Sequence, residues 1–309
     1  MKNSQKAKRH HFVPECYLKN FIVDKNLYTL DIYKVQKGYN VRPKPSQPAM
    51  ICYYEDFYKI GPDFADKLFK LNQYDELFIE TDVLRKLEGK YGSLYQKITS
   101  LNELSFTEAV SVSDFIIQMK LRNPYHLQRY LEEHKDEYID TIMNSIYEKS
   151  FMKEDHFAHI PKEIQKFVYD DVRESSKADV SYAKKIQLYG LIQRYSENDE
   201  RNNIFREAII KSEWLLLVSP SNGPYFITSD NPGFSINPHD NLINNTRFRE
   251  GFAFYFPLSP RFCLLITDIL FDDNAYVKKQ SKAILKMNVD GNSVIEVNDK
   301  SIQCINKLL

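Results

Sequence analysis

The chain has 309 residues, 43% of them apolar, which is long enough to bury a core as one large domain or two modest ones. Lys plus Arg and Asp plus Glu both number 42, so the overall charge favours no polyanionic partner. Only 9 glycines occur and no glycine-rich phosphate-binding motif is present, which argues against the common nucleotide-binding loops.

The sequence shows no feature of a membrane or secreted protein. No apolar run is long enough to span a bilayer, and the first residues lack the apolar segment of a secretory signal. The four cysteines are scattered, without the spacing of zinc or redox motifs. We therefore expect a cytoplasmic protein with reduced cysteines that does not contact the membrane.

The chain begins with a basic segment and paired histidines. Residues 1–10 carry four basic side chains and no acid, which is typical of a solvated tail and would also suit contact with phosphate. His10 and His11 follow, and a neutral imidazole can act as a general base or a metal ligand. Neighbours in an extended segment point to opposite sides, so only one should enter a site, and the sequence does not select between them. The alternative is a structural role, with one histidine buried and the other exposed.

Aromatic residues follow the histidines at helical spacing. Tyr17 and Phe21 lie four residues apart, after Pro14 at a helix start. We expect Phe21 to pack in the core. Tyr17 is a candidate substrate-binding residue, with its hydroxyl directed into a cleft.

Strands are predicted next. Residues 27–35 alternate apolar and polar side chains, which predicts a strand, and residues 36–40 supply a turn into a return strand at 39–42. An N-terminal β-hairpin results. Residues 51–58 predict a short helix or turn that leads into a strand.

From about residue 63 to residue 201, the spacing of apolar residues predicts helices. Ser105 and Glu108 match a capping box, which predicts a helix start. This helix should end near Arg122, because the residue before Pro124 is restricted to extended backbone. Further helices are predicted over residues 125–151, after Pro161, and over residues 186–210.

One face of the capped helix is polar. Asp114, Gln118 and Arg122 are spaced by four residues and border the apolar side chains of Phe115 and Met119. Gln118 and Arg122 are therefore candidate binders of a carboxylate or phosphate, with arginine as a bidentate donor. The alternative is a salt bridge on the helix surface.

Strands return after residue 211. Residues 214–218 form a buried-type run, residues 225–228 predict a strand, and residues 252–258 and 261–266 predict paired strands around a Ser259-Pro260 turn. The tail from residue 275 should mix a short helix with a polar connector at residues 290–292.

Polar residues follow the strand predicted at 225–228. Asp230 is a candidate metal ligand or base at a strand end, with Ser229 and Asn231 as candidate substrate-binding neighbours. The alternative is a turn in which these side chains bond nearby backbone amides. Arg261 is a candidate anion clamp, or else a structural ion-pair partner of Asp230 or Glu15.

These elements predict an α+β fold, in which an N-terminal β-hairpin and C-terminal antiparallel strands form a sheet and a large helical region lies between them. We expect one domain over residues 1–309. Its parts are the N-terminal motif and strands at 1–60, the helical region at 61–211, and the C-terminal strands and tail at 212–309.

Four motifs in this order resemble a bacterial family known as domain of unknown function 4238. They are His10-His11-x-Val13-Pro14-x-x-Tyr17-Leu18-x-x-Phe21, Gln118-x-x-x-Arg122-x-Pro124, Phe226 to Pro232, and Tyr255 to Arg261. The segment from residue 298 to 309 also resembles the end of the family, whereas residues 290–292 depart from it. The resemblance implies a shared fold and candidate site positions, and no particular reaction.

We therefore expect a hydrolase, such as a nuclease, acting on an anionic phosphodiester-type substrate. His10 or His11 would act with Asp230 in catalysis, and an arginine would stabilise developing negative charge. No cofactor is specified, although a divalent metal would suit these residues. The expected partner is an anionic ligand or nucleic acid, and no protein partner is indicated. The alternative is a non-enzymatic binding or sensing module, in bacterial stress or phage defence, with the polar motifs as a structural network.

Overall fold

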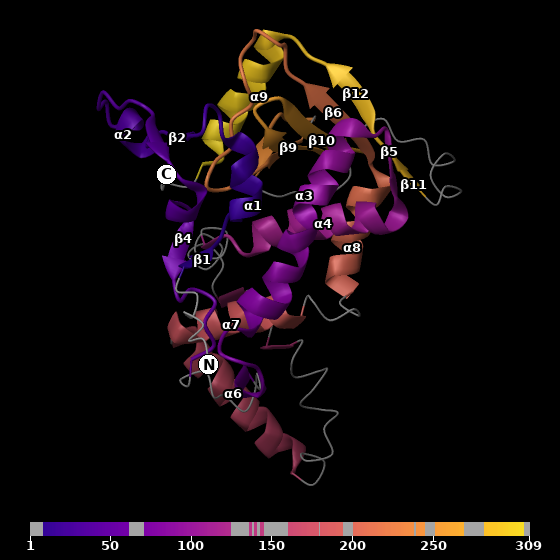
Figure 1. Cartoon of the computed structure of the whole chain (residues 1–309). Helices are drawn as coiled ribbons and strands as arrows, with labels where there is room; N and C mark the ends of the chain where they lie inside the picture. The colour runs from indigo at the N-terminus through magenta and orange to yellow at the C-terminus, as the bar shows by residue number, and fades with distance from the viewer. Residues whose placement is uncertain are drawn as a thin grey trace, which may run out of the picture. The chain divides into compact units, whose positions relative to one another are not determined.

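The protein is described from a computed structural model (Figure 1). It describes residues 9–61, 71–124, 136–137, 139–140, 143–144, 160–178, 180–193, 200–237, 239–244, 251–268 and 281–305. The chain divides into two compact units. The first comprises Met1–Phe57, Glu80–Asn123 and Glu197–Leu309, and the second comprises Tyr58–Ile79 and Pro124–Ser196. The predicted helical region thus contributes to both units.

The first unit begins with short strands and turns. Strand β1 (Arg9–His11) pairs antiparallel with β4 (Tyr53–Glu55), and β2 (Leu27–Thr29) pairs antiparallel with β3 (Lys44–Ser46). Helix α1 (Glu15–Leu18) runs into the 3-10 turn η1 (Lys19–Phe21), and a second 3-10 turn, η2 (Pro48–Met50), precedes β4. The predicted N-terminal hairpin is present, with its return strand at residues 44–46 rather than 39–42.

The strand predicted over residues 27–35 is wrong beyond Thr29. Residues Ile32–Gln36 form helix α2 instead. The Asp31 side chain caps it by accepting a hydrogen bond of 3.0 Å from the Lys34 backbone N–H. None of the residues of α2 is buried. The alternating pattern therefore did not mark a buried face, and the local cap decides the conformation.

Helices follow in the first unit. The π-helical turn η5 (Ile79–Leu84) leads into α3 (Arg85–Ser100), and β5 (Glu103–Ser105) precedes α4 (Phe106–Leu121). The predicted capping box is confirmed, since the Ser105 hydroxyl accepts from the Glu108 N–H and the Glu108 carboxylate accepts from the Ser105 N–H. The predicted end of this helix is confirmed as well, because Arg122 is its C-cap. Helix α8 (Glu200–Lys211) leads into the C-terminal strands.

The C-terminal strands form a six-stranded sheet in the order β12-β6-β10-β9-β7-β8. Its strands are β6 (Glu213–Val218), β7 (Phe234–Ile236), β8 (Ile243–Asn244), β9 (Ala253–Ser259), β10 (Phe262–Thr267) and β12 (Leu285–Asn288). All neighbours pair antiparallel except β12, which runs parallel to β6. A further strand, β11 (Ser281–Ala283), pairs with β5 outside this sheet. The predicted α+β class is confirmed.

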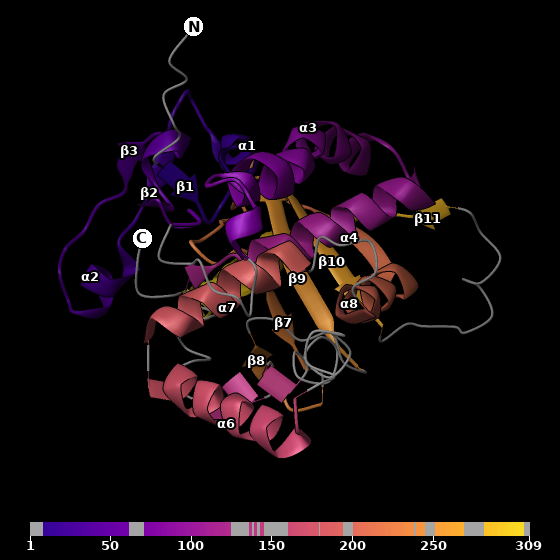
Figure 2. The same ribbon diagram turned by 90° about the horizontal axis from the view of Figure 1, so that it is seen from below.

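Helices pack against both faces of this sheet. Figure 2 shows α4 crossing over β9 and β10 on one of them. Trp214 and Leu216 of β6 pack in the core that includes residues of α3, α4 and α8, whereas Leu215 and Leu217 pack with residues of α9 (Gly291–Gln303). Successive side chains of a strand point to opposite faces, so a strand buried on both faces carries a continuous apolar run. This explains the buried-type sequence at residues 214–218.

Two further predictions in the C-terminal part are corrected. Residues 290–292 are not a connector, because the Asp290 side chain caps α9 by accepting a hydrogen bond of 2.8 Å from the Ser293 N–H. Residues 225–228 form no strand of the sheet. Their backbone is held instead by a bond from the Phe226 N–H to the Pro260 carbonyl and by the Asn298 side chain.

The described part of the second unit is mainly helical. It contains η4 (Leu71–Gln73), α6 (Lys162–Ala178) and α7 (Val180–Gln193). Helix α6 follows Pro161 as predicted, and its Arg173 pairs with Asp140 at 2.5 Å. Most of the helix predicted over residues 125–151 lies outside the described residues. Among the described helices, none combines the length and hydropathy needed to cross a bilayer.

Candidate functional site

The C-terminal end of α4 carries four buried polar residues: Gln118, Lys120, Arg122 and Asn123. Buried polar groups must be hydrogen-bonded or they destabilise the fold. Because successive positions of a helix face different directions, these side chains meet different neighbours. Two polar clusters result, one around Arg122 and one around Lys120.

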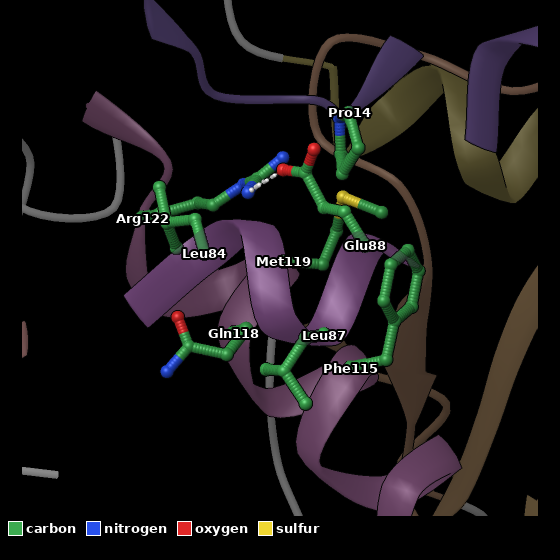
Figure 3. A pocket seen from close by; sticks show the side chains of 8 residues that line it. All are labelled: Pro14, Leu84, Leu87, Glu88, Phe115, Gln118, Met119 and Arg122. Carbon is green, nitrogen blue, oxygen red and sulfur yellow. Dashed lines mark hydrogen bonds and ion pairs between the residues drawn. The ribbon is translucent and has the colours of Figure 1, made fainter. Parts of the chain in front are cut away.

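Arg122 is buried with only 2% of its surface exposed. Its Nη1 donates to Glu88 Oε1 of α3 at 2.7 Å, and its Nε donates to the Phe12 carbonyl at 3.0 Å. Figure 3 shows the guanidinium and the Glu88 carboxylate facing one another across the two helices. The surface salt bridge considered for Asp114 and Arg122 does not form, because Asp114 pairs with Arg206 of α8.

A pocket lies beside this pair (Figure 3). The space inside it that is open to a water-sized molecule is about 10 Å³, enough for about one water and far below the roughly 300–1,000 Å³ of typical small-molecule sites. The lining residues are Pro14, Leu84, Leu87, Glu88, Phe115, Gln118, Met119 and Arg122. Within the described part of the chain, the buried Gln118 Oε1 has no hydrogen-bond partner. The pocket thus offers a guanidinium, a carboxylate and an amide along an otherwise apolar wall.

Of the paired histidines, His11 is the one near this pocket. Its Nε2 lies 3.8 Å from Glu15 Oε1 and makes no hydrogen bond among the described residues. Burial lowers the pKa of His11, Arg122 lowers it too, and Glu15 and Glu88 oppose both effects. A hydrogen bond with the Ala49 backbone also raises it. His10 is fully buried at the neighbouring position of β1, opposite Tyr54, as the alternation of side chains along a strand requires.

Glu80 is a site residue that the sequence did not reveal. It lies in the π-helical turn η5, and burial raises its pKa to about 7, with Arg122 opposing and Glu88 adding to the rise. Such turns occur frequently at functional sites. Nothing in the local sequence distinguishes this glutamate from the other acids around it. We refer to His11, Glu15, Glu80, Glu88 and Arg122 as the arginine cluster.

The second cluster joins α4 to the segment after residue 228. Lys120 Nζ donates to Asn231 Oδ1 at 3.0 Å and to the Gly233 carbonyl. Asn123 Nδ2 donates to the Asp230 carbonyl at 2.8 Å. Burial lowers the pKa of Lys120 to about 7, whereas Cys304 and Asp230 raise it. We refer to Lys120, Asn123, Ser229, Asp230 and Asn231 as the lysine cluster.

The lysine cluster also binds the end of α9 and its own turn. Asn231 Nδ2 donates to the Cys304 carbonyl at 3.1 Å, and the Ser229 hydroxyl accepts from the Asn231 N–H at 3.1 Å. Ser229, Asp230 and Asn231 are all buried. These contacts fit the turn interpretation of Ser229 and Asn231. The cluster thereby links a helix, a buried turn and the C-terminal helix.

The sequence profile of the family described as Protein of unknown function (DUF4238) matches residues 9–309. The chain belongs to this family. The resemblance seen in the four motifs is therefore confirmed, and the DUF4238 match covers both polar clusters. No curated protein and no solved structure matches the chain.

Two candidate residues of this DUF4238 chain lie elsewhere. The Tyr17 hydroxyl does not face a cleft, because it is buried and donates to the Pro257 carbonyl at 2.6 Å, with Thr228 Oγ1 at 2.8 Å. Arg261 pairs with neither Asp230 nor Glu15 in the described contacts. Its Nη1 donates to the Pro220 carbonyl at 2.5 Å, which holds two neighbouring turns together.

The DUF4238 fold thus gathers the sequence candidates in two groups. His11 and Arg122 belong to the arginine cluster, with Gln118 lining its pocket, whereas Ser229, Asp230 and Asn231 belong to the lysine cluster. Within the described residues, no three His, Cys, Asp or Glu side chains come together as metal ligands would. The arrangement of the arginine cluster is that of acid–base groups around a buried cation.

Proposed function

We propose that the arginine cluster is the site of a hydrolase that acts on a phosphodiester-like anionic substrate. One observation supports this most strongly. Burial shifts two groups near Arg122 in opposite directions, because it lowers the pKa of His11 and raises that of Glu80 to about 7, so that between these two values His11 is neutral and Glu80 is protonated. Pairs of groups shifted in this way are typical of acid–base sites.

Each group has a role in this proposal. His11 Nε2 accepts a proton from water, whose oxygen forms a bond to phosphorus while the bond to the leaving oxygen breaks. The protonated Glu80 carboxyl donates its proton to that leaving oxygen. Arg122 stabilises the negative charge that develops on the phosphoryl oxygens.

The test is hydrolysis of bis(p-nitrophenyl) phosphate, single-stranded DNA and RNA by the purified protein, with and without Mg²⁺, Mn²⁺ or Zn²⁺. We expect His11→Gln and Glu80→Gln each to lower kcat by about 10²-fold or more. The exposed His239 provides the matched control, and His239→Gln should leave the rate unchanged. Absence of turnover above that of the His11→Gln/Glu80→Gln double variant would overturn the proposal.

The second candidate function is a non-enzymatic binding or sensing module, in bacterial stress or phage defence. The lysine cluster favours it, because the buried side chains of Lys120, Asn123 and Asn231 are bonded to one another and to backbone rather than presented to a ligand. In that case the polar motifs stabilise the fold.

This candidate makes its own prediction. Asn123→Ala should lower the free energy of unfolding by about 1–3 kcal/mol, because the Asp230 carbonyl loses its buried donor. Thermal melts combined with the hydrolysis assay separate the candidates. If His11→Gln and Glu80→Gln lower stability with no activity to lose, the module is favoured, whereas lost activity at an unchanged melting temperature favours the hydrolase.

A further inference from the structure

Residues 22–46 form a projecting element that we call the arm. It consists of β2, α2 and β3, with α2 at its outer end in both Figure 1 and Figure 2. Helix α2 buries no residue, although short helices in water are stable only when a face is packed. The arm therefore has a surface that the rest of the first unit does not cover.

The exposed side chains of the arm are aromatic and basic. Tyr28, Tyr33 and Tyr39 are 53%, 40% and 63% exposed. The arm carries five basic residues (Lys25, Lys34, Lys37, Arg42 and Lys44) and two acids (Asp24 and Asp31), a net charge of +3 in a chain whose formal net charge is zero. All five basic residues are exposed. The arm is thus a local cationic surface with aromatic rings on it.

The geometry places rings and cations together. Lys37 Nζ lies 4.3 Å from the centroid of the Tyr33 ring. Tyr28 lies opposite Pro45 in the strand pair, next to the pair of Thr29 and Lys44. The Asp31 carboxylate has two partners: its Oδ1 caps α2 by accepting from the Lys34 N–H, and its Oδ2 lies 3.5 Å from Lys34 Nζ. Asp31, one of the two acids of the arm, is therefore already partnered.

The arm is continuous with the arginine cluster. It runs into η2, where the Ala49 carbonyl accepts a hydrogen bond of 3.3 Å from Arg9 Nη1. The His11 ring is also hydrogen-bonded with the Ala49 backbone. The Arg9 guanidinium lies 5.0 Å from the centroid of the Tyr53 ring, directly opposite His11 in the β1–β4 pair. A second cation–aromatic pair thus stands between the arm and His11.

We propose that the arm binds single-stranded nucleic acid and leads its backbone to the arginine cluster. Positive side chains neutralise phosphates, and exposed aromatic rings stack on unpaired bases, which is how proteins hold single strands without sequence preference. An acidic protein would match the charge but would leave the three tyrosine rings without a role. Delivery to the cluster rests on the proposed hydrolase function, whereas binding by the arm does not.

The test is fluorescence anisotropy with labelled oligothymidylate and oligouridylate of about 20 nucleotides. We expect Tyr28→Ala/Tyr33→Ala/Tyr39→Ala to weaken binding by about tenfold or more, through lost stacking. Lys34→Glu/Lys37→Glu/Arg42→Glu should weaken it further and reduce the slope of log affinity against log salt by about 2, for three lost phosphate contacts. The two oligonucleotides distinguish DNA from RNA as the preferred strand.

Matched controls lie outside the arm. Lys162→Glu/Lys166→Glu/Lys211→Glu makes the same change in net charge at exposed lysines, and Tyr225→Ala removes an exposed ring. Both controls should bind as the wild type does. Absence of binding by the wild type, or equal losses in arm and control variants, would overturn the proposal. Equal competition by polyglutamate or by duplex DNA would overturn the choice of single strands.

Hydrolysis of bis(p-nitrophenyl) phosphate separates this proposal from the hydrolase. This substrate is too short to span the arm, so the arm variants should hydrolyse it at the wild-type rate. Binding through the arm without any hydrolysis supports the arm and contradicts the hydrolase. Hydrolysis without arm-dependent binding contradicts the arm alone.

Discussion

At the scale of single residues, the Arg122–Glu88 pair is the main electrostatic feature of the site. Arg122 is 2% exposed, whereas the Glu88 side chain is 29% exposed. If a buried cation loses its partner, an uncompensated charge remains in the protein interior. This lowers the free energy of unfolding by far more than the intact pair adds to it. Arg122 was predictable from the sequence because it lies on the same helix face as Gln118. Glu88 was not, because its partner lies 34 positions away.

Glu88→Gln should therefore destabilise the protein by about 2–4 kcal/mol, somewhat less than a fully buried pair because Glu88 is partly exposed. Urea denaturation measures the change. The matched control is Glu207→Gln, which breaks the exposed Lys211–Glu207 pair and should cost less than about 1 kcal/mol. Similar costs for both variants would contradict the importance of the buried pair.

Lys120 should make stability depend on pH. Burial lowers its pKa to about 7 in the folded protein, against about 10.4 when unfolded. Between these values the unfolded chain binds more protons than the folded one, so rising pH favours folding. The nearby ionisable groups are Asp230 and Cys304, which oppose the shift without abolishing it.

The free energy of unfolding of the wild type, relative to Lys120→Met, should accordingly rise from pH 7 to pH 9, by at most about 1.4 kcal/mol per pH unit. Taking the difference between the two proteins removes the opposite effect of the buried cysteines, whose raised pKa values lower stability at alkaline pH. Urea titrations at several pH values supply the measurement. A difference that is flat or falls with pH would show that Lys120 remains charged in the fold.

At the scale of elements, the packing of the turn after residue 228 on β9 is decided by one glycine. Gly233 has a φ of +80°, and a Cβ there would lie 2.8 Å from Phe254 Cζ and 3.0 Å from the Tyr255 carbonyl oxygen. Gly38 has nearly the same φ, +81°, with nothing within 4 Å. At both positions a residue with a side chain would strain the backbone, because φ is positive. The positions differ in the space that is available for that side chain.

Gly38→Ala should therefore lower the free energy of unfolding by about 1 kcal/mol, through backbone strain alone. Gly233→Ala should lower it by about 1–3 kcal/mol more, because the new methyl group also overpacks the core. Thermal or urea unfolding of the two variants checks the difference. Equal destabilisation would mean that the turn moves aside easily and does not position the lysine cluster.

The elements also show where sequence patterns suffice. The capping box of α4 and the doubly buried β6 were predictable because each is determined by residues within one segment. Helix α2 and the start of α9 were missed because their aspartate caps, Asp31 and Asp290, look like turn residues in the sequence. Asp230 was placed after a strand that does not form, because its segment is held by side chains distant in sequence.

At the scale of the whole molecule, family membership and the α+β class were predictable from four motifs in order and from the change of periodicity along the chain. The composition of the site was not. Its pKa shifts arise from burial by segments that lie far apart in sequence, as Glu80, His11 and Arg122 do. The assignment of these residues to two clusters likewise depends on the direction of successive side chains on α4.

The central claim is that His11 and Glu80 act as base and acid, and the pH dependence of kcat/KM for bis(p-nitrophenyl) phosphate tests it most directly. The rate should rise through the lowered pKa of His11, which must be neutral, and fall above about pH 7, where Glu80 loses its proton. Glu80→Gln should remove the falling limb and lower the maximum at an unchanged melting temperature. No hydrolysis, or the same profile in wild type and Glu80→Gln, would contradict the assignment.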